Sequence, residues 1–154
     1  MNSNKFAAYA CLLSAVIFAV VGIFADHSLT LDMHVHDTYF VISLPHTLTA
    51  VKLIFLLGWI CYYFLPSFFP FKTLTWIQVV ITLLMSLVIV GNTLWARRFI
   101  DLISVEGFEL NNRYMIWAFL GLMSGLLLFI GHFVIGTLLC LFRRFNSPSF
   151  NSPL

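Results

Sequence analysis

The sequence predicts an all-α protein, an integral membrane bundle of four transmembrane helices. Of the 154 residues, 61% are hydrophobic and only 9% are charged, and the mean hydropathy is +0.99. A soluble domain has roughly a quarter of its residues charged. Four apolar runs each supply the roughly 20 residues that a helix needs to cross the hydrocarbon. The net charge of +2 is too small to indicate binding to nucleic acid. The apolar composition instead predicts that the chain lies in the lipid bilayer.

The apolar runs set the expected helix boundaries, which are about 6–25, 43–65, 74–96 and 114–142. Together they form one membrane domain over residues 1–145. The first run is longer than the apolar region of a signal peptide, which has about 7–15 residues, so we expect a retained helix. Pro45 suits the first turn of the second helix, because its missing N–H is not needed there.

The connections between these helices are polar or contain proline. The segment 26–42 is too short and too polar to cross a membrane, and we expect a loop there. Two prolines are expected to keep the segment 66–72 from being helical. A hydrophilic loop with Asp101 and Arg113 precedes the fourth helix, and the Asn-, Ser- and Pro-containing tail 146–154 is expected to be disordered.

The basic residues predict the orientation of the bundle. Four flank one side and three flank the other, and these are Lys5, Lys72, Arg143 and Arg144 against Arg97, Arg98 and Arg113. Because basic residues favour the cytoplasmic side, we expect both termini in the cytoplasm. The expected location is the bacterial inner membrane. All six acidic residues fall on the side of the membrane opposite to the two termini, which agrees with this orientation.

A few reactive groups stand alone inside the apolar runs. Cys11, Cys61 and Cys140 have no metal-type spacing and are interpreted as small packing residues. Lys52 lies about two turns into the second helix. A lysine there either snorkels to the interface or has a functional partner.

The polar stretch between the first two helices is rich in metal-ligand residues. His34, His36 and Asp37 lie close together, with Asp32 nearby. Imidazole suits zinc or copper, and carboxylate suits harder ions such as magnesium. The alternative is a solvated, acidic outer loop that binds no metal.

Two other histidines lie inside predicted spans. His46 is at the start of the second helix and His132 is deep in the fourth. An intramembrane histidine indicates function, and imidazole is a common axial ligand of haem iron. With the predicted topology the two lie near opposite surfaces, so they are not expected to bind one iron. Arg97 and Arg98 end the third helix on the side of His46, and arginine pairs bind carboxylates such as haem propionates. The alternative is ordinary interfacial anchoring.

The order of residues in the polar stretch resembles haem-copper oxidase subunit I. In that family a segment of the form L-D-x-x-x-H-D-T-Y-x-V leads into helix ten, and here Leu31-Asp32 and the run HDTYFV at 36–41 match it. The resemblance extends to the spacing of the helices and to the run 97–99 (RRF). The whole chain is similar to the last four helices of that subunit, standing alone.

The resemblance implies roles for individual residues. His46 corresponds to the ligand of the low-spin haem, and Leu44 stands where the family has the high-spin haem ligand. Arg97 and Arg98 match the pair that holds propionates, and Asp32 matches an acid near them. His36 and Asp37 match an outer metal site, usually magnesium. The copper ligands come from helices that this chain lacks, so oxygen reduction by this polypeptide alone is not expected.

Three functional interpretations remain open from the sequence. In the first, His46 binds a low-spin haem for electron transfer or within a respiratory complex, and a homodimer or a partner membrane subunit supplies the second ligand. In the second, the chain is a cofactor-free structural or assembly subunit. In the third, the outer loop binds a metal such as copper or zinc through His34, His36 and Asp37.

Overall fold

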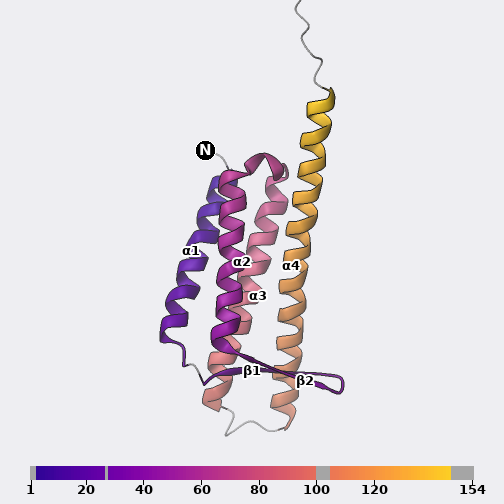
Figure 1. Cartoon of the computed structure of the whole chain (residues 1–154). Coiled ribbons are helices and arrows are strands. Elements are labelled where there is room, and N and C mark those ends of the chain that lie inside the picture. Colours follow the sequence, from indigo (N-terminus) through magenta and orange to yellow (C-terminus); the bar gives the residue numbers. More distant parts are fainter. Residues whose placement is uncertain (1–2, 27, 100–104, 147–154) are drawn as a thin grey trace, which may run out of the picture.

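The chain folds into a helical bundle with a small β-hairpin at one end. Figure 1 shows the computed structural model, which describes residues 3–26, 28–99 and 105–146. Within these residues the elements are α1 (Ser3–Phe24), β1 (Thr30–Val35), β2 (Thr38–Ser43), α2 (Leu44–Phe64), the 3-10 turn η1 (Pro66–Phe68), α3 (Lys72–Phe99) and α4 (Val105–Asn146). Four of the described helices are long and apolar enough to cross a membrane, which confirms the predicted fold class.

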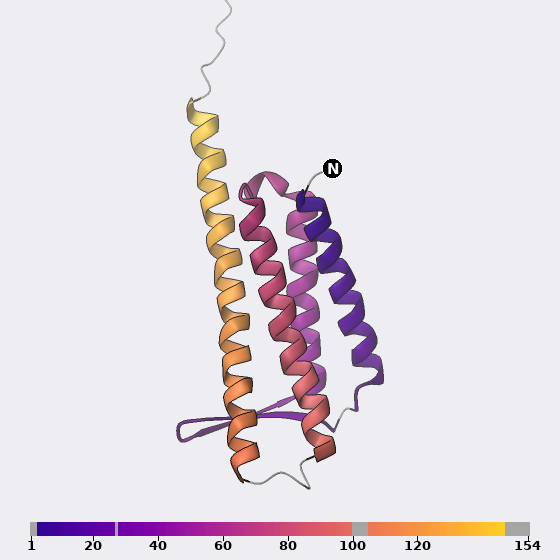
Figure 2. The ribbon, with the colours of Figure 1, turned by 180° about the vertical axis from the view of Figure 1, so that it is seen from behind.

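The four helices associate mainly in two pairs. α1 packs against α2, α3 packs against α4, and α1 also contacts α3. Figures 1 and 2 show the hairpin lying across one end of the bundle, which we call the hairpin end. η1 and the start of α1 lie at the other end, which we call the turn end, and α4 extends beyond it.

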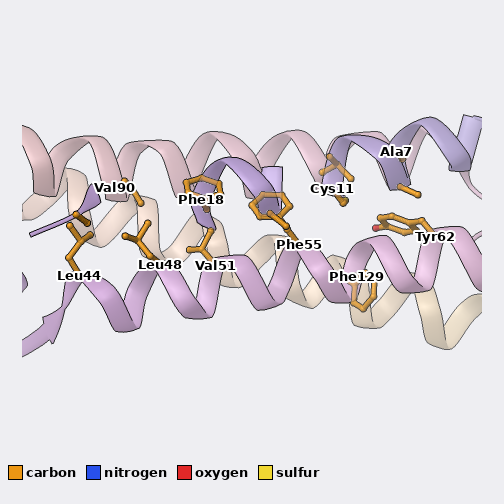
Figure 3. Packing of buried hydrophobic residues seen from close by; sticks show 14 of the residues in the cluster. Ala7, Cys11, Phe18, Leu44, Leu48, Val51, Phe55, Tyr62, Val90 and Phe129 are labelled. Atoms are coloured by element: carbon orange, nitrogen blue, oxygen red, sulfur yellow. The ribbon is translucent and has the colours of Figure 1, made fainter. Parts of the chain in front are cut away.

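The core between the first two helices is built from buried aromatic and aliphatic side chains (Figure 3). Phe18 on α1 stacks on Phe55 on α2, with ring centroids 5.7 Å apart. Tyr62 lies edge-on to Phe129 of α4 at 5.9 Å, which connects the two helix pairs. Cys11 is buried in the same core, in agreement with its interpretation as a packing residue.

The turn end is held together by close backbone approach. A Cβ atom added at Gly136 of α4 would lie 1.7 Å from the carbonyl oxygen of Phe68, so only glycine allows α4 to touch η1 there. The Asn4 side chain donates hydrogen bonds to the carbonyl oxygens of Phe69 at 3.1 Å and Pro66 at 3.4 Å. These contacts therefore attach both α1 and α4 to the connection between α2 and α3.

The first three helices begin and end within three residues of their predicted boundaries, whereas two predictions were wrong. α4 begins at Val105 rather than near residue 114. Glutamates stabilise the first turns of a helix, because their negative charge interacts favourably with the positive N-terminal end of the helix dipole. The helix can therefore begin before it enters the membrane. The connection after α2 contains one 3-10 turn, because Pro66 fits its first position. Residues 147–154 of the predicted disordered tail lie outside the described residues.

The polar stretch forms an antiparallel hairpin, where a loop was expected. Val35 pairs with Thr38, so His36 and Asp37 make a two-residue turn. His36 has a φ of 56°, a left-handed conformation that such turns require. Leu31 and Met33 are buried on the face of the hairpin that packs against the bundle.

Candidate functional site

A partly open apolar cavity of about 300 Å³ lies at the hairpin end. The hairpin, α2, α3 and α4 all contribute to its wall. The lining residues are Leu31, Met33, Ile42, His46, Thr47, Ala50, Val51, Ile54, Ile89, Met115, Phe119, Leu122 and Met123. Its volume lies at the lower end of the range of small-molecule and cofactor sites, about 300–1,000 Å³. An apolar wall with one imidazole suits an apolar ligand that needs a single polar or metal-ligating contact.

His46 reaches this cavity from the first turn of α2. Ser43 precedes the helix with an extended backbone, and its side chain does not cap the helix. The Ser43 hydroxyl is instead hydrogen-bonded to His46 Nδ1. This hydrogen bond fixes the orientation of the imidazole. Nε2 is left to bind a metal in the tautomer in which Nδ1–H donates to the Ser43 hydroxyl. In that tautomer His46 has its second nitrogen hydrogen-bonded, as metal-binding histidines do, and its side chain is exposed.

The backbone of Arg97 and Arg98 is in the last turn of α3, which ends at the hairpin end (Figure 1). Their side chains lie outside the described part of the structure. Helix α3 also brings Ile89 to the cavity wall, two turns before the arginines. The backbone of Arg97 and Arg98 thus lies at the same end of the bundle as His46.

Asp32 lies on the face of β1 opposite to Leu31 and Met33, so it does not line the cavity. Among the described residues its Oδ1 has no hydrogen-bond partner and is buried. Desolvation, followed by the charge of Asp32 and a side-chain hydrogen bond to it, raises the pKa of the neighbouring Tyr39. Asp32 therefore interacts with the outer face of the hairpin and not with the cavity.

The predicted metal ligands His34, His36 and Asp37 are exposed at the tip of the hairpin. Figures 1 and 2 show that this tip projects past α4. The His34 ring lies beside Tyr39, with centroids 6.3 Å apart. Within the described residues, no group of three or more His, Cys, Asp or Glu side chains is arranged to hold a metal. The structure thus separates these three residues from the His46 cavity.

Two other candidate residues lie away from the cavity. Lys52 lines a depression between α1 and α2, together with Phe18 and Gly22, and its side chain is half-buried. His132 is 1% exposed and lies at the turn end, where its Nε2 accepts a hydrogen bond from the Phe71 N–H at 3.2 Å. His132 therefore binds the backbone just before α3 and is far from His46 along the bundle.

Sequence reasoning missed the methionines of the cavity and the residue that attaches the hairpin. Met33, Met115 and Met123 come from two different elements, and each alone looks like an ordinary core residue. Asn112 of α4 accepts a hydrogen bond from the His34 N–H at 2.9 Å and donates one to the His34 carbonyl at 2.7 Å. The only signal in the sequence was the unusual Asn-Asn pair at 111–112 before an apolar run.

No protein-family model, no curated protein and no solved structure matches the chain.

Proposed function

We propose that this chain is a small membrane haem protein in which His46 is an axial ligand of a low-spin haem. It would act in electron transfer or as part of a respiratory complex, and not as an oxygen reductase by itself. The observation that carries the proposal is the position of His46, which lines an apolar cavity while Ser43 holds its Nδ1. The resemblance of the stretch 31–46 to haem-copper oxidase subunit I supports the same assignment.

The residues around the cavity supply some of the groups that a haem site needs. Haem needs a nitrogen or sulfur ligand, an apolar slot for its ring and cations for its propionates. The cavity offers His46 and apolar walls, and α3 ends in Arg97 and Arg98 at the same end of the bundle. Haem supplies reversible one-electron chemistry when bound. The protein orients it through His46 and excludes water through the apolar wall.

The cavity is small for a haem, so part of the ring would extend through its open side. Ala50 and Ile54 of α2 and Phe119 and Met123 of α4 border the cavity on facing helices. Lipid, a second copy of the chain or a partner membrane subunit would cover that side. A homodimer is the simplest arrangement that hides an exposed ring from the bilayer.

An absorption spectrum of the purified protein tests the proposal. Protein from haem-replete membranes should show a Soret band and, on reduction, split α and β bands. His46→Ala should abolish both. His34→Ala is the matched control, because His34 does not line the cavity, and this variant should leave the spectrum unchanged. A colourless wild-type protein would overturn the proposal and favour the cofactor-free structural or assembly role.

A further inference from the structure

Strand β2 forms an unprotected edge of the hairpin. Its residues from Thr38 to Ile42 are all exposed, and Tyr39 and Val41 are 53% and 55% exposed. The strand contains no charged residue, proline or glycine, and it pairs with β1 without a bulge. Charges, prolines and bulges are the devices that normally keep an edge strand from pairing further. Aromatic and β-branched residues favour strands, so β2 is suited to accept another strand beside it.

The hydrogen bonds of the hairpin show which backbone groups face outward. The N–H and C=O of His34 bond to the Asn112 side chain of α4, so they point away from β2. Antiparallel strands alternate between hydrogen-bonded and non-hydrogen-bonded pairs, so Tyr39, the partner of His34, also has both groups outward. The same alternation turns the N–H and C=O of Val41 outward. Among the described residues, no backbone group outside the hairpin bonds to these four groups.

A second copy of the chain fits this edge through two-fold symmetry. Figures 1 and 2 show both strands at the same level of the bundle, so the hairpin lies flat across the helices. Two antiparallel edges are related by a two-fold axis that passes through the plane of their sheet. That axis runs along the helices here, so both copies have the same orientation across a membrane. Because β2 carries no charge, self-pairing brings no like charges together.

We propose that two copies of the chain associate through the outer edges of β2 and form a four-stranded antiparallel sheet. Tyr39 lies opposite the partner's Val41, and Phe40 lies opposite the partner's Phe40 on the two-fold axis. In this register the outward groups of Tyr39 and Val41 all pair with one another. A shift by two residues in either direction would pair one of them with Asp37 or Ser43 instead.

The proposed sheet would stabilise the hairpin and place the second copy beside the cavity. A two-stranded hairpin is marginally stable alone, and further strands stabilise it. Aromatic and β-branched residues opposite each other, such as Tyr39 and the partner's Val41, are favourable cross-strand pairs. Ile42 of β2 lines the cavity, so the paired edge borders the proposed haem site. The pairing itself uses only β2 and requires no haem.

Disulfide cross-linking in native membranes tests the register. The test variant is Phe40→Cys in the full-length chain, with the three native cysteines Cys11, Cys61 and Cys140 changed to alanine. In a non-hydrogen-bonded pair the Cα atoms are about 4.5 Å apart, within the range of a disulfide. Mild oxidation should therefore give a covalent dimer. Val35→Cys is the matched control, because the β1 strands of the two copies would be about 14 Å apart, and it should stay monomeric.

A proline variant tests the hydrogen bonds. Val41→Pro removes an N–H that the hairpin does not use, so the hairpin should persist while pairing between copies is lost. Val41→Ala keeps the N–H and is the control. The mass of the detergent-solubilised polypeptide should be twice 17.6 kDa in the wild type and in Val41→Ala, and 17.6 kDa in Val41→Pro. Hydrogen exchange in β1 reports whether the hairpin remains.

The outcomes separate this inference from the haem proposal. A dimer that persists in His46→Ala or in colourless protein supports strand pairing even if no haem is bound. A monomeric wild type, a dimeric Val41→Pro, or equal cross-linking of Phe40→Cys and Val35→Cys would overturn the inference. Cross-linking of Phe40→Cys to a different protein would also overturn it. If Val41→Pro does not fold, the cross-linking of Phe40→Cys decides.

Discussion

Asn112 on α4 and His34 on β1 are joined by a pair of hydrogen bonds that run in opposite directions. The His34 N–H donates to Asn112 Oδ1 at 2.9 Å, and Asn112 Nδ2 donates to the His34 carbonyl at 2.7 Å. The side-chain amide thus takes the place that a third strand would have at the edge of β1. A two-stranded hairpin is marginally stable alone, so this attachment and the packing of Leu31 and Met33 hold it on the bundle.

Asn112→Ala is expected to loosen the hairpin without unfolding the bundle. Two exposed hydrogen bonds are lost, each with a net contribution of about 0.5–1.5 kcal/mol. Hydrogen exchange of the amides in β1 and β2 should become faster, while exchange in α1 stays the same. Asn111→Ala is the matched control at the neighbouring position. Equal exchange in the two variants would show that Asn112 does not hold the hairpin.

Gly136→Ala is expected to destabilise the turn end. The new methyl group would meet the Phe68 carbonyl at 1.7 Å, and either α4 or η1 must move. Overpacking of this kind costs about 1–3 kcal/mol. Gly131→Ala is the control on the same helix, because no atom lies within 4 Å of its added Cβ. Unfolding in detergent measures both, and equal stabilities would contradict the close contact.

His132→Ala is expected to lower stability and to leave any haem spectrum unchanged. His132 accepts a hydrogen bond from the part-buried Phe71 N–H before α3, and loss of this bond costs about 0.5–1.5 kcal/mol. Thermal unfolding and an absorption spectrum of the same sample measure the two effects. A spectrum that changes as it does in His46→Ala would mean that His132, and not only His46, contacts the cofactor.

Lys52→Met is expected to leave the haem midpoint potential close to that of the wild type. Lys52 lines the depression between α1 and α2, whereas His46 lines the cavity with α3 and α4. A cation near the iron would favour the reduced form, so its removal would lower the potential. A large fall in potential, measured by redox titration, would place Lys52 beside the iron.

The helices could be predicted from the sequence, because length and hydropathy alone determine a membrane span. The start of α4 was missed for the same reason, since polar residues such as Glu109 and Asn112 ended the apolar pattern but not the helix. The hairpin also had a signal in the sequence. Leu31 and Met33 alternate with Asp32 and His34, which is the period of a strand. A His-Asp turn lacks the glycine that usually marks a hairpin.

The candidate site was predicted in part. His46 was identified because a histidine at the start of a membrane helix is rare. Its support by Ser43 and the methionines around it depend on tertiary packing, since β1, α2 and α4 meet only in the folded chain. The proposed roles of Arg97 and Arg98 stay predictions, because their side chains lie outside the described residues.

The haem content of the purified protein tests the central claim most directly. Wild-type protein, His46→Ala and His132→Ala would be prepared in parallel from haem-replete membranes, and haem per polypeptide would be measured. The account predicts stoichiometric haem in the wild type and in His132→Ala, and none in His46→Ala. Equal haem content in the wild type and His46→Ala, or no haem in any of the three, would contradict it.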